Sequence, residues 1–518
     1  MAFVLIGFMG AGKSTAAAEL AAALGGEALD SDALLEQRLG HPLAREFELH
    51  GEQAFRALEE ELVCDLLNSA APDSAIALGG GSVLSERVRA ALDGHVTVLL
   101  DVDPQTAWER VQGSPDGAAR PLARQREDFL ALHASRRALY EGLADTILSD
   151  LSVGGIAPTV PALRALAAAP AGTRLLWASA ASGQYPVLIG RGLLSLADNR
   201  HLDALWPLDR ARSRAFCVSD DTVAALYADS LGALAGTFAI EPGETHKTLA
   251  SAERVWGALI AAEMTRADHL VALGGGVVGD LAGFCAATFQ RGVPIVHVPT
   301  TLVAQVDSAY GGKTGVDMPQ AKNYVGCYHQ PAGVLVDPDT LATLPAVELN
   351  AGWVEVLKTA LIAGGELWQT VAAGGPVDER VIFECARTKL AIVAADERDA
   401  GARQVLNLGH TVGHAIETAT GYSRYRHGEA VGLGLLAALT LSGQDELRGR
   451  ARALMAARDL PVTLEGVPVD AILEAVTRDK KRVGRHVPFV LVRAPGEVEF
   501  GCEAGPEDVR AAVAELAP

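Results

Sequence analysis

A glycine-rich stretch near the start of the sequence has the residue types and spacing of a phosphate-binding loop. Residues 7–14 read GFMGAGKS and follow an apolar run, Ala2 to Ile6. In such a loop the glycines let backbone N–H groups converge on phosphate oxygens, Lys13 can bridge the β- and γ-phosphates, and Ser14 offers a hydroxyl to Mg²⁺. The pattern predicts a nucleoside triphosphate site but does not identify the acceptor of the phosphate.

Two carboxylates follow the helix that this loop should begin. Asp30 and Asp32 flank a serine. One can hold a magnesium-bound water while the other orients a hydroxyl nucleophile, and phosphoryl transfer needs both tasks. We therefore expect the first part of the chain to phosphorylate a hydroxyl group.

A second set of reactive side chains lies far downstream. His410 and His414 are four residues apart, so on a helix they would lie on the same face, and His427 follows closely. Glu355 adds a carboxylate, and a set of two histidines and one glutamate leaves coordination positions open for substrate, as catalytic zinc requires. The HExxH pattern of zinc proteases is absent. Spacing alone leaves all four side chains as candidate ligands.

Another glycine run, GGGVVGD at residues 274–280, follows an apolar run that ends at Leu273. It should open a helix at a phosphate-binding turn. The run is only loosely related to the GxGxxG pattern of dinucleotide sites. On this pattern alone, a dinucleotide site and a tight structural turn both remain open.

Length and composition limit the possible classes of protein. A chain of 518 residues exceeds what one hydrophobic core usually supports, so we expect two or three domains. A net charge of −20 opposes general affinity for nucleic acid or acidic membranes, and small anions are the expected ligands. The six cysteines form no CxxC pair, which fits a reducing cytoplasm. No apolar run reaches the roughly 20 residues of a membrane span, and the apolar start is too short for a signal peptide.

These candidate sites must be positioned by strands and helices. Short apolar runs alternate with helix-length segments, which predicts parallel sheets with helices on both faces, an α/β fold class. The expected strands are residues 2–6, 75–78, 95–100, 187–189, 215–218, 269–273 and 295–298. Helical spacing dominates beyond about residue 345. We predict domains at residues 1–155, 175–344 and 345–518, joined after the first by an Ala- and Pro-rich linker at residues 156–174.

The first part also carries a family resemblance. Phe55-Arg56, Gly79-Gly80-Gly81 and Arg120-Pro121-Leu122 follow the phosphate loop and the aspartates in that order. Together these motifs resemble shikimate kinase, and the resemblance covers essentially residues 1–150. It implies a P-loop kinase domain that transfers phosphate from ATP, with Mg²⁺, to shikimate.

The resemblance assigns roles residue by residue. It implies ATP contacts at Gly10, Ala11, Gly12, Lys13, Ser14, Thr15 and Arg120, with Mg²⁺ held at Ser14 and Asp30. It implies shikimate contacts at Asp32, Arg56, Gly79, Gly80, Gly81 and Arg136, and catalytic roles for Lys13, Asp32 and Arg120. Arginine is suited to binding the carboxylate of shikimate because its planar guanidinium pairs with a carboxylate in bidentate fashion. Arg136 is preferred to Arg137 because the family's arginine precedes a tyrosine that corresponds to Tyr140.

The second part resembles another family. Residues 299–308, PTTLVAQVDS, and residues 311–314, GGKT, follow the second glycine run. With that run and the histidine cluster they closely resemble 3-dehydroquinate synthase, from about Gly183 to Val492. The resemblance implies a Rossmann-like NAD-binding domain over residues 175–344 and a mainly α-helical metal- and substrate-binding domain over residues 345–518. It implies zinc, with cobalt as a possible substitute, at Glu355, His410 and His427.

This family's other site residues carry over as well. The resemblance implies NAD⁺ contacts at Asp220, Glu244, Lys247, Gly275, Gly276, Val277, Asp280, Thr300, Thr301, Lys313, Lys322 and Thr343. It implies substrate contacts at Arg291, Asp307, Lys313, Asn323, Lys358, Lys389, Arg403, Asn407, His414 and Lys480, with the role of Lys480 against Lys481 left open. So many cations suit a substrate with both phosphate and carboxylate. The expected catalytic residues are His414, Lys313 and Lys358, with His414 moving protons.

The two resemblances together predict a bifunctional, cytoplasmic enzyme of aromatic amino acid biosynthesis. One half would phosphorylate shikimate, and the other would convert 3-deoxy-D-arabino-heptulosonate 7-phosphate to 3-dehydroquinate with release of phosphate. Family members of the second kind are usually homodimers, with the arginine matching Arg291 reaching across the interface. The expected partners are otherwise small molecules, without nucleic acid or membrane.

Two alternatives differ in function. The second half could be a related sugar-phosphate cyclase, but the presence of Lys389, Arg403 and Asn407 argues against another substrate. The chain could instead be a nucleotide-sensing scaffold with degenerate sites. A degenerate site would be expected to lose at least one reactive residue, whereas this chain keeps Lys13, Asp32, Glu355, His410 and His427.

Overall fold

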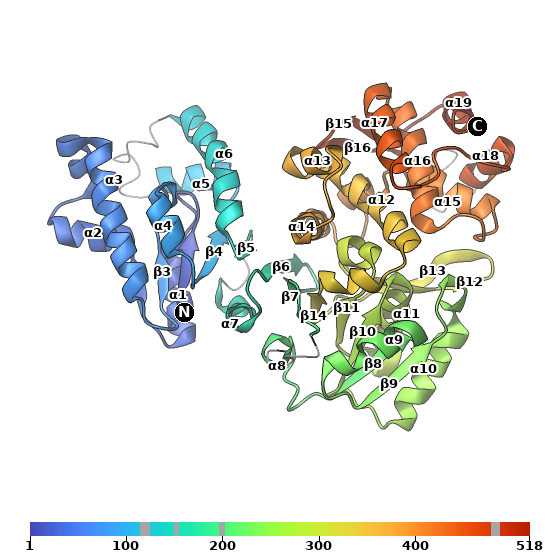
Figure 1. The fold of residues 1–518 in the computed structure, drawn as a ribbon, viewed down its shortest axis with the longest axis horizontal. Coiled ribbons are helices and arrows are strands. Elements are labelled where there is room, and N and C mark those ends of the chain that lie inside the picture. The colour runs from blue at the N-terminus through green and yellow to red at the C-terminus, as the bar shows by residue number, and fades with distance from the viewer. Residues whose placement is uncertain (114–124, 150–154, 196–201, 478–486, 518) are drawn as a thin grey trace. The chain divides into compact units, whose positions relative to one another are not determined.

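The computed structural model describes residues 1–113, 125–149, 155–195, 202–477 and 487–517, in two compact units (Figure 1). The first unit comprises residues 1–177, 186–188 and 200–207, and the second comprises residues 178–185, 189–199 and 208–518. Residues 156–174, which we expected to be a linker, contain helix α7 (Val160–Ala168), whose Leu163 and Leu166 are buried. The positions of the domain boundaries stay a prediction.

The first unit is built on a parallel sheet with the strand order β2-β3-β1-β4-β5-β6. Residue Phe3 of β1 pairs with Ala75 of β3 on one side and with Val96 of β4 on the other, so the predicted parallel arrangement is confirmed. The strands are β1 (Phe3–Ile6), β2 (Ala28–Asp30), β3 (Ala75–Ala77), β4 (Val96–Leu100), β5 (Thr146–Leu148) and β6 (Arg174–Ala180). The helices, besides α7, are α1 (Lys13–Leu24), α2 (Ser31–Leu39), α3 (Leu43–Ser69), α4 (Glu86–Ala91), α5 (Pro104–Gln112), α6 (Arg126–Leu143) and α8 (Leu202–Leu205).

The α/β part of the second unit has a second parallel sheet, in the order β14-β11-β10-β8-β9. Its strands are β8 (Ala215–Asp220), β9 (Gly236–Ile240), β10 (His269–Gly274), β11 (Ile295–Pro299) and β14 (Gly333–Val336), preceded by β7 (Gly183–Ile189). Its helices are α9 (Asp221–Tyr227), α10 (Leu249–Ala261) and α11 (Gly276–Thr288). The antiparallel hairpin β12 (Lys313–Met318) and β13 (Ala321–Tyr328) packs against α11.

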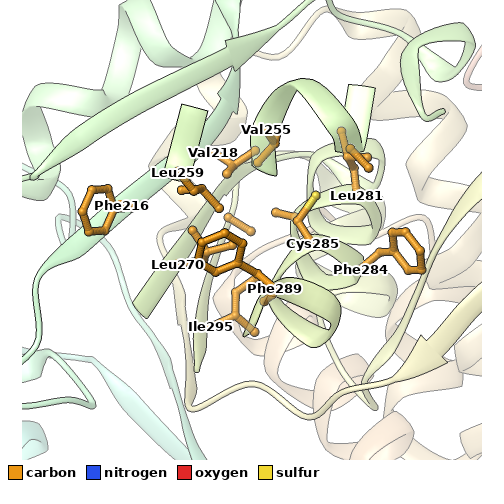
Figure 2. Close-up of a cluster of buried hydrophobic side chains, with 14 of the residues drawn as sticks. Phe216, Val218, Val255, Leu259, Leu270, Leu281, Phe284, Cys285, Phe289 and Ile295 are labelled. Atoms are coloured by element: carbon orange, nitrogen blue, oxygen red, sulfur yellow. The ribbon is translucent and has the colours of Figure 1, made fainter. Parts of the chain in front are cut away.

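The core of this part lies between the sheet and helices α10 and α11, as Figure 2 shows. Leu270 of β10 and Ile295 of β11 are fully buried with Leu259 of α10 and with Leu281 and Cys285 of α11. Burying such side chains stabilises a fold by about 1.5–3 kcal/mol each. This core holds the carboxyl ends of the strands in register, and the second glycine run follows one of those ends.

The rest of the second unit is mainly helical, as predicted (Figure 1). Its helices are α12 (Ala346–Ala363), α13 (Gly365–Ala372), α14 (Glu379–Ala395), α15 (His410–Ala419), α16 (His427–Leu441), α17 (Asp445–Ala456), α18 (Val469–Thr477) and α19 (Pro506–Ala514). We did not expect the hairpin of β15 (Phe489–Ala494) and β16 (Glu497–Cys502), which turns at Gly496 with φ of +92°. No helix in the described ranges is long and apolar enough to cross a membrane.

Glycines allow three of these helices to approach one another closely. A Cβ atom added at Gly434 of α16 would lie 2.6 Å from the backbone nitrogen of Gly413 on α15 and nearer still to a carbonyl oxygen. One added at Gly428 of α16 would overlap the carbonyl of Ala351 on α12. Helices α12, α15 and α16 therefore pack backbone to backbone, and side chains that emerge beside these contacts converge.

We predict opposite effects of alanine at two helical glycines. Gly434→Ala should destabilise the second unit by about 1–3 kcal/mol because the new methyl group overpacks the contact with α15. Gly449→Ala on α17 meets no atom within 4 Å and should stabilise it by about 0.5–1 kcal/mol through helix propensity. Chemical denaturation of both variants checks this, and equal effects would contradict the close packing.

Candidate active sites

The phosphate-binding loop joins β1 to α1 as the sequence predicts. Gly7, Gly10 and Gly12 have φ of +143°, +82° and +87°, a region that L side chains rarely adopt. A Cβ atom at Gly10 would also lie 2.5 Å from the carbonyl oxygen of Ala107. No side chain caps the start of α1, so its first N–H groups are available to an anion. The Lys13 ammonium donates to the carbonyl oxygens of Gly7 and Phe8 at 2.9 and 3.1 Å, so it lies over the loop.

The acceptor side of this site forms around the glycines after β3. A Cβ atom at Gly79 would lie 2.5 Å from Asp32 Oδ1, and one at Gly81 would overlap the guanidinium of Arg56. A side chain at either glycine would therefore displace Asp32 or Arg56 from its place against the backbone. Asp30 caps α2, since its Oδ1 accepts from the backbone N–H of Asp32 at 3.0 Å. The structure thus brings Asp32, Arg56 and the glycine run together.

Arg136 and Arg137 face different surroundings. Arg136 is buried and donates to the carbonyl oxygen of Gly80 at 3.2 Å, an oxygen that also accepts from the Tyr140 hydroxyl. Arg137 instead donates to Glu141 at 2.8 Å and is half exposed. The preferred arginine is therefore the one next to the glycine run. Arg120 lies outside the described residues.

Sequence reasoning missed Glu59 in this unit. Its buried carboxylate accepts from Arg56 at 2.6 Å through Oε2 and from the Ser82 hydroxyl at 2.8 Å through Oε1. The position three residues after Arg56 on α3 is the signal that could have found it, because residues i and i+3 of a helix are neighbours. Glu59 holds Arg56 beside Gly81.

The second glycine run lies at the turn between β10 and α11. Helix α11 begins at Gly276 without a side-chain cap, and Val277 lies in its first turn. A Cβ atom at Gly275 would lie 2.8 Å from Thr301 Cγ2, so the turn needs glycine there. The buried Thr300 hydroxyl lacks a hydrogen-bond partner within the described part of the chain. These donors at one end of a parallel sheet fit a dinucleotide diphosphate.

The other residues expected at this site are placed along the same sheet. Asp220 ends β8, and its Oδ1 accepts from the backbone N–H groups of Thr222 and Val223 at the start of α9. The Thr343 hydroxyl lies 2.6 Å from that of Tyr227 on the same helix. Asp220 can therefore offer only its second carboxylate oxygen to a ribose hydroxyl.

A buried lysine organises the charges beside the turn. Lys247 lies 2.9 Å from Glu244, 3.2 Å from Asp280 and 2.8 Å from Asn323 Oδ1. Burial alone would lower the pKa of Lys247, but Asp280 and Glu244 raise it overall, so the ammonium stays charged. Asp317, 3.7 Å away, also faces it and was missed from the sequence. These contacts join the predicted dinucleotide residues to the predicted substrate residue Asn323.

The three predicted metal ligands converge from three helices. Glu355 projects from α12, while His410 and His427 are the first residues of α15 and α16. Glu355 Oε1 lies 3.7 Å from Nε2 of each histidine. The carbonyl oxygen of Leu408 lies 3.1 Å from His410 Nδ1, so that nitrogen donates to it and Nε2 is left as the ligand atom.

The donor set fits a zinc-type ion. Glu355 is fully buried; its Oε2 is ion-paired with Lys358, and its Oε1 has no hydrogen-bond partner among the described residues. Buried carboxylates normally have partners, and a cation between one carboxylate and two imidazoles would provide one. His414, Glu417 and His427 form a second, overlapping set that could also hold an ion. The structure therefore groups Glu355, His410 and His427 as one ligand set, and His414 remains a candidate ligand in the second set.

Cations and acids alternate around this centre. Lys358 Nζ, one helical turn after Glu355, lies 2.5 Å from its Oε2, and Lys389 Nζ lies 2.7 Å from Asp307 Oδ1. Burial alone would lower the pKa of Lys358, but Glu355 and Asp307 raise it. Burial would raise the pKa of Asp307, but Lys389 and Lys358 lower it. Both lysines and Asp307, which we expected to contact the substrate, thus lie next to the proposed metal ligands.

The remaining predicted substrate residues differ in burial and in their partners. Arg403 is buried at the start of the turn before His410 and donates to the carbonyl oxygen of Gly311 at 3.0 Å. Asn407 ends the same turn, η10 (Ala402–Asn407). Lys313 lies 2.6 Å from Asp399. Arg291 is exposed, and its side chain forms no ion pair or hydrogen bond with any residue in the described ranges. Lys480 and Lys481 lie outside the described residues.

Sequence reasoning also missed Glu417. This buried residue of α15 lies 3.5 Å from His427 Nδ1 and 3.4 Å from Lys322 Nζ. Burial alone would raise the pKa of Glu417, but His427, Lys322 and His414 lower it to about 2. Its position three residues after His414 on one helix was the available signal.

The two arrangements support different chemistry. The site in the first unit can hold a nucleoside triphosphate next to an acceptor that carries a carboxylate. The second can place a Lewis-acidic ion, a dinucleotide and several cations around one anionic substrate.

Comparisons with known proteins agree with this division. A shikimate kinase family model matches residues 9–152, and models of the 3-dehydroquinate synthase N-terminal and C-terminal regions match residues 237–351 and 352–482. The 3-dehydroquinate synthase of Halorhodospira halophila is 43% identical over 353 residues, which are 64% of this chain and 97% of that protein.

Two solved structures share the fold of the second unit. The structure of 2-epi-5-epi-valiolone synthase from Streptomyces hygroscopicus subsp. jinggangensis 5008, with NAD⁺ and Zn²⁺ bound, has a TM-score of 0.57 and 28% identity over 64% of this chain and 96% of that one. A 2-deoxy-scyllo-inosose synthase complexed with carbaglucose-6-phosphate, NAD⁺ and Co²⁺ has a TM-score of 0.58 over 66% of this chain and 100% of that one. At 23% identity it supports the fold alone.

Proposed function

The chain belongs to the 3-dehydroquinate synthase family and carries a shikimate kinase domain ahead of the synthase, and we propose that each half catalyses its own reaction at the site described above. The first half phosphorylates shikimate with ATP. The second half converts 3-deoxy-D-arabino-heptulosonate 7-phosphate to 3-dehydroquinate and phosphate. For the second half, the buried carboxylate of Glu355, whose Oε1 faces two imidazole nitrogens without a hydrogen bond, supports this proposal most directly. The free cysteines fit a cytoplasmic setting.

The kinase residues divide between the two substrates. The backbone of the loop and Lys13 hold the ATP phosphates, while Ser14 and Asp30 hold Mg²⁺ directly or through water. Arg56 and Arg136 bind the shikimate carboxylate, and Asp32 orients the hydroxyl that attacks the γ-phosphate. Asp32 suits this task because it lies at Gly79, where the acceptor residues converge.

The synthase residues hold the two cofactors around one substrate. Glu355, His410 and His427 would bind zinc, and the turn at Gly275 with Thr300 would bind NAD⁺. When bound, NAD⁺ can accept and return a hydride, and the zinc ion can polarise a hydroxyl group. A hydride that is accepted and returned within one turnover would leave NAD⁺ unchanged, so no net oxidation would occur.

The chain's own charges select and orient the substrate. Lys358 and Lys389, both buried, attract its anionic groups, and Arg403 and Asn407 lie at the turn that leads to His410. His414, whose ring centroid lies 5.2 Å from that of His410, is placed to carry a proton. The second half of this chain is 43% identical to a dehydroquinate synthase but 28% to the valiolone synthase, which favours dehydroquinate synthesis over another cyclisation.

The first prediction separates the two activities. Lys13→Ala should abolish shikimate phosphorylation and leave dehydroquinate formation intact, because the loop and the metal set share no residue. Glu355→Gln should do the reverse. Glu348→Gln, on the same helix but paired with Arg426 at the surface, is the matched control and should affect neither activity. Loss of both activities from either of the first two variants, in folded protein, would contradict two independent sites.

A second prediction distinguishes the neighbouring arginines. Arg136→Lys should raise the KM for shikimate about tenfold or more, because it replaces a bidentate guanidinium next to Gly80 by a point charge. Arg137→Lys should change the KM less than about twofold, since Arg137 pairs with Glu141 instead. Steady-state kinetics with saturating ATP measures both, and the opposite ranking would show that Arg137 binds the acceptor.

We also propose that the synthase half forms a homodimer through the face around Ile260. This side chain is 68% exposed beside Trp256 and Phe289 in an apolar depression, next to the turn that bears Arg291. Ile260→Glu should shift the protein from dimer to monomer in sedimentation velocity, because a charge there opposes burial. A dimer that persists unchanged would exclude this face.

A further inference from the structure

We propose that Glu417 is a positioning residue that fixes the ring of His427 in the orientation that binds the metal, which rests on the proposed zinc site. Glu417 Oε2 lies 3.5 Å from His427 Nδ1, while His427 Nε2 lies 3.7 Å from Glu355 Oε1. The ring therefore has a carboxylate on each side. A proton on Nδ1 that points at Glu417 leaves the lone pair on Nε2 for the metal.

The surroundings of Glu417 hold it in this place. Its other oxygen, Oε1, lies 3.4 Å from Lys322 Nζ, and its side chain is buried. Lys322 is itself held by Glu244 at 3.5 Å and by the ring of Tyr422 at 4.6 Å from the centroid. The carboxylate thus has one cation for one oxygen and one imidazole for the other.

This pairing differs from that of Glu355. Among the described residues Glu355 Oε1 has no hydrogen-bond partner and faces the two ligand imidazoles, whereas both oxygens of Glu417 face a polar hydrogen donor. A carboxylate that is already satisfied by protein groups is suited to orient a ligand rather than to bind the metal itself.

The overlapping set His414, Glu417 and His427 raises the alternative that Glu417 binds a second metal ion. Both sets share His427, and a neutral imidazole has one lone pair and one N–H. It cannot bind two ions at once without losing its last ring proton. Two ions at once would need His427 as a bridging imidazolate, whereas with one metal at Glu355 the ring keeps its Nδ1 proton and Glu417 is the acceptor of that proton.

The contact between Glu417 and His427 also links helices α15 and α16. Glu417 belongs to α15, whose first residue is His410, whereas His427 begins α16. Helix α15 thus supplies one ligand and orients the other. The connection continues through Lys322 to the hairpin strand β13 beside the dinucleotide residues, so the orientation of His427 depends on both parts of the unit.

The test is zinc affinity of the full-length protein, measured by competition with a chromophoric chelator. Glu417→Gln and Glu417→Asp should each bind Zn²⁺ about 10- to 100-fold more weakly, the usual effect of losing such a partner. The matched control is Glu429→Gln, a carboxylate two residues after His427 that pairs with Arg426 instead and should leave the affinity unchanged. Circular dichroism verifies the fold, and the visible spectrum of the Co²⁺-loaded protein should change in the Glu417 variants alone.

Each other outcome has a defined meaning. Wild-type affinity and an unchanged Co²⁺ spectrum in both folded Glu417 variants would overturn the positioning role. Two zinc ions per wild-type chain, falling to one in Glu417→Gln, would make Glu417 a ligand and also overturn it. Failure of the wild-type protein to bind zinc would instead contradict the proposed metal site.

Discussion

The synthase half depends on one buried charge, the carboxylate of Glu355. An uncompensated ion in the interior costs several kcal/mol, so the fold must provide partners for it. Lys358 on the same helix and two imidazoles from α15 and α16 lie around it. Those imidazoles reach it only because glycines let α12, α15 and α16 approach closely. The same close packing of the three helices therefore brings the proposed metal ligands together.

From this centre the charges alternate outward across the unit. Lys358 lies near Asp307, which is paired with Lys389, and on the other side His427 faces Glu417 and then Lys322. Glu244 and Lys247 continue the series to the turn that starts α11. Neighbours of opposite sign raise the pKa of Lys358 and Lys247 and lower the pKa of Asp307, Glu417 and Glu244, so these five groups stay charged.

The phosphate-binding loop and most strands could be predicted from the sequence, because they depend on residues that are close together in the chain. The strand, glycine loop and helix around Lys13 follow from spacing alone, and so does the parallel order of the alternating segments. Helical spacing from His414 could have pointed to Glu417, but its pairing with His427 on the next helix could not be found in this way, and neither could that of Asp317 with Lys247, because these groups meet only in the fold. Helix α7 was missed because a segment rich in proline and alanine resembles a linker. It is stabilised as a helix by the burial of Leu163 and Leu166, which the sequence alone does not show.

We propose that one chain carries both a zinc-dependent synthase and a kinase that does not need zinc. The direct measurement follows phosphate release from the heptulosonate phosphate and ATP-dependent phosphorylation of shikimate in one full-length sample, with NAD⁺ and excess Mg²⁺. A zinc-selective chelator should abolish phosphate release and dehydroquinate formation, added zinc should restore them, and shikimate phosphorylation should continue throughout. Phosphate release that persists after complete removal of metal, or that never occurs in folded, zinc-loaded protein, would contradict the account.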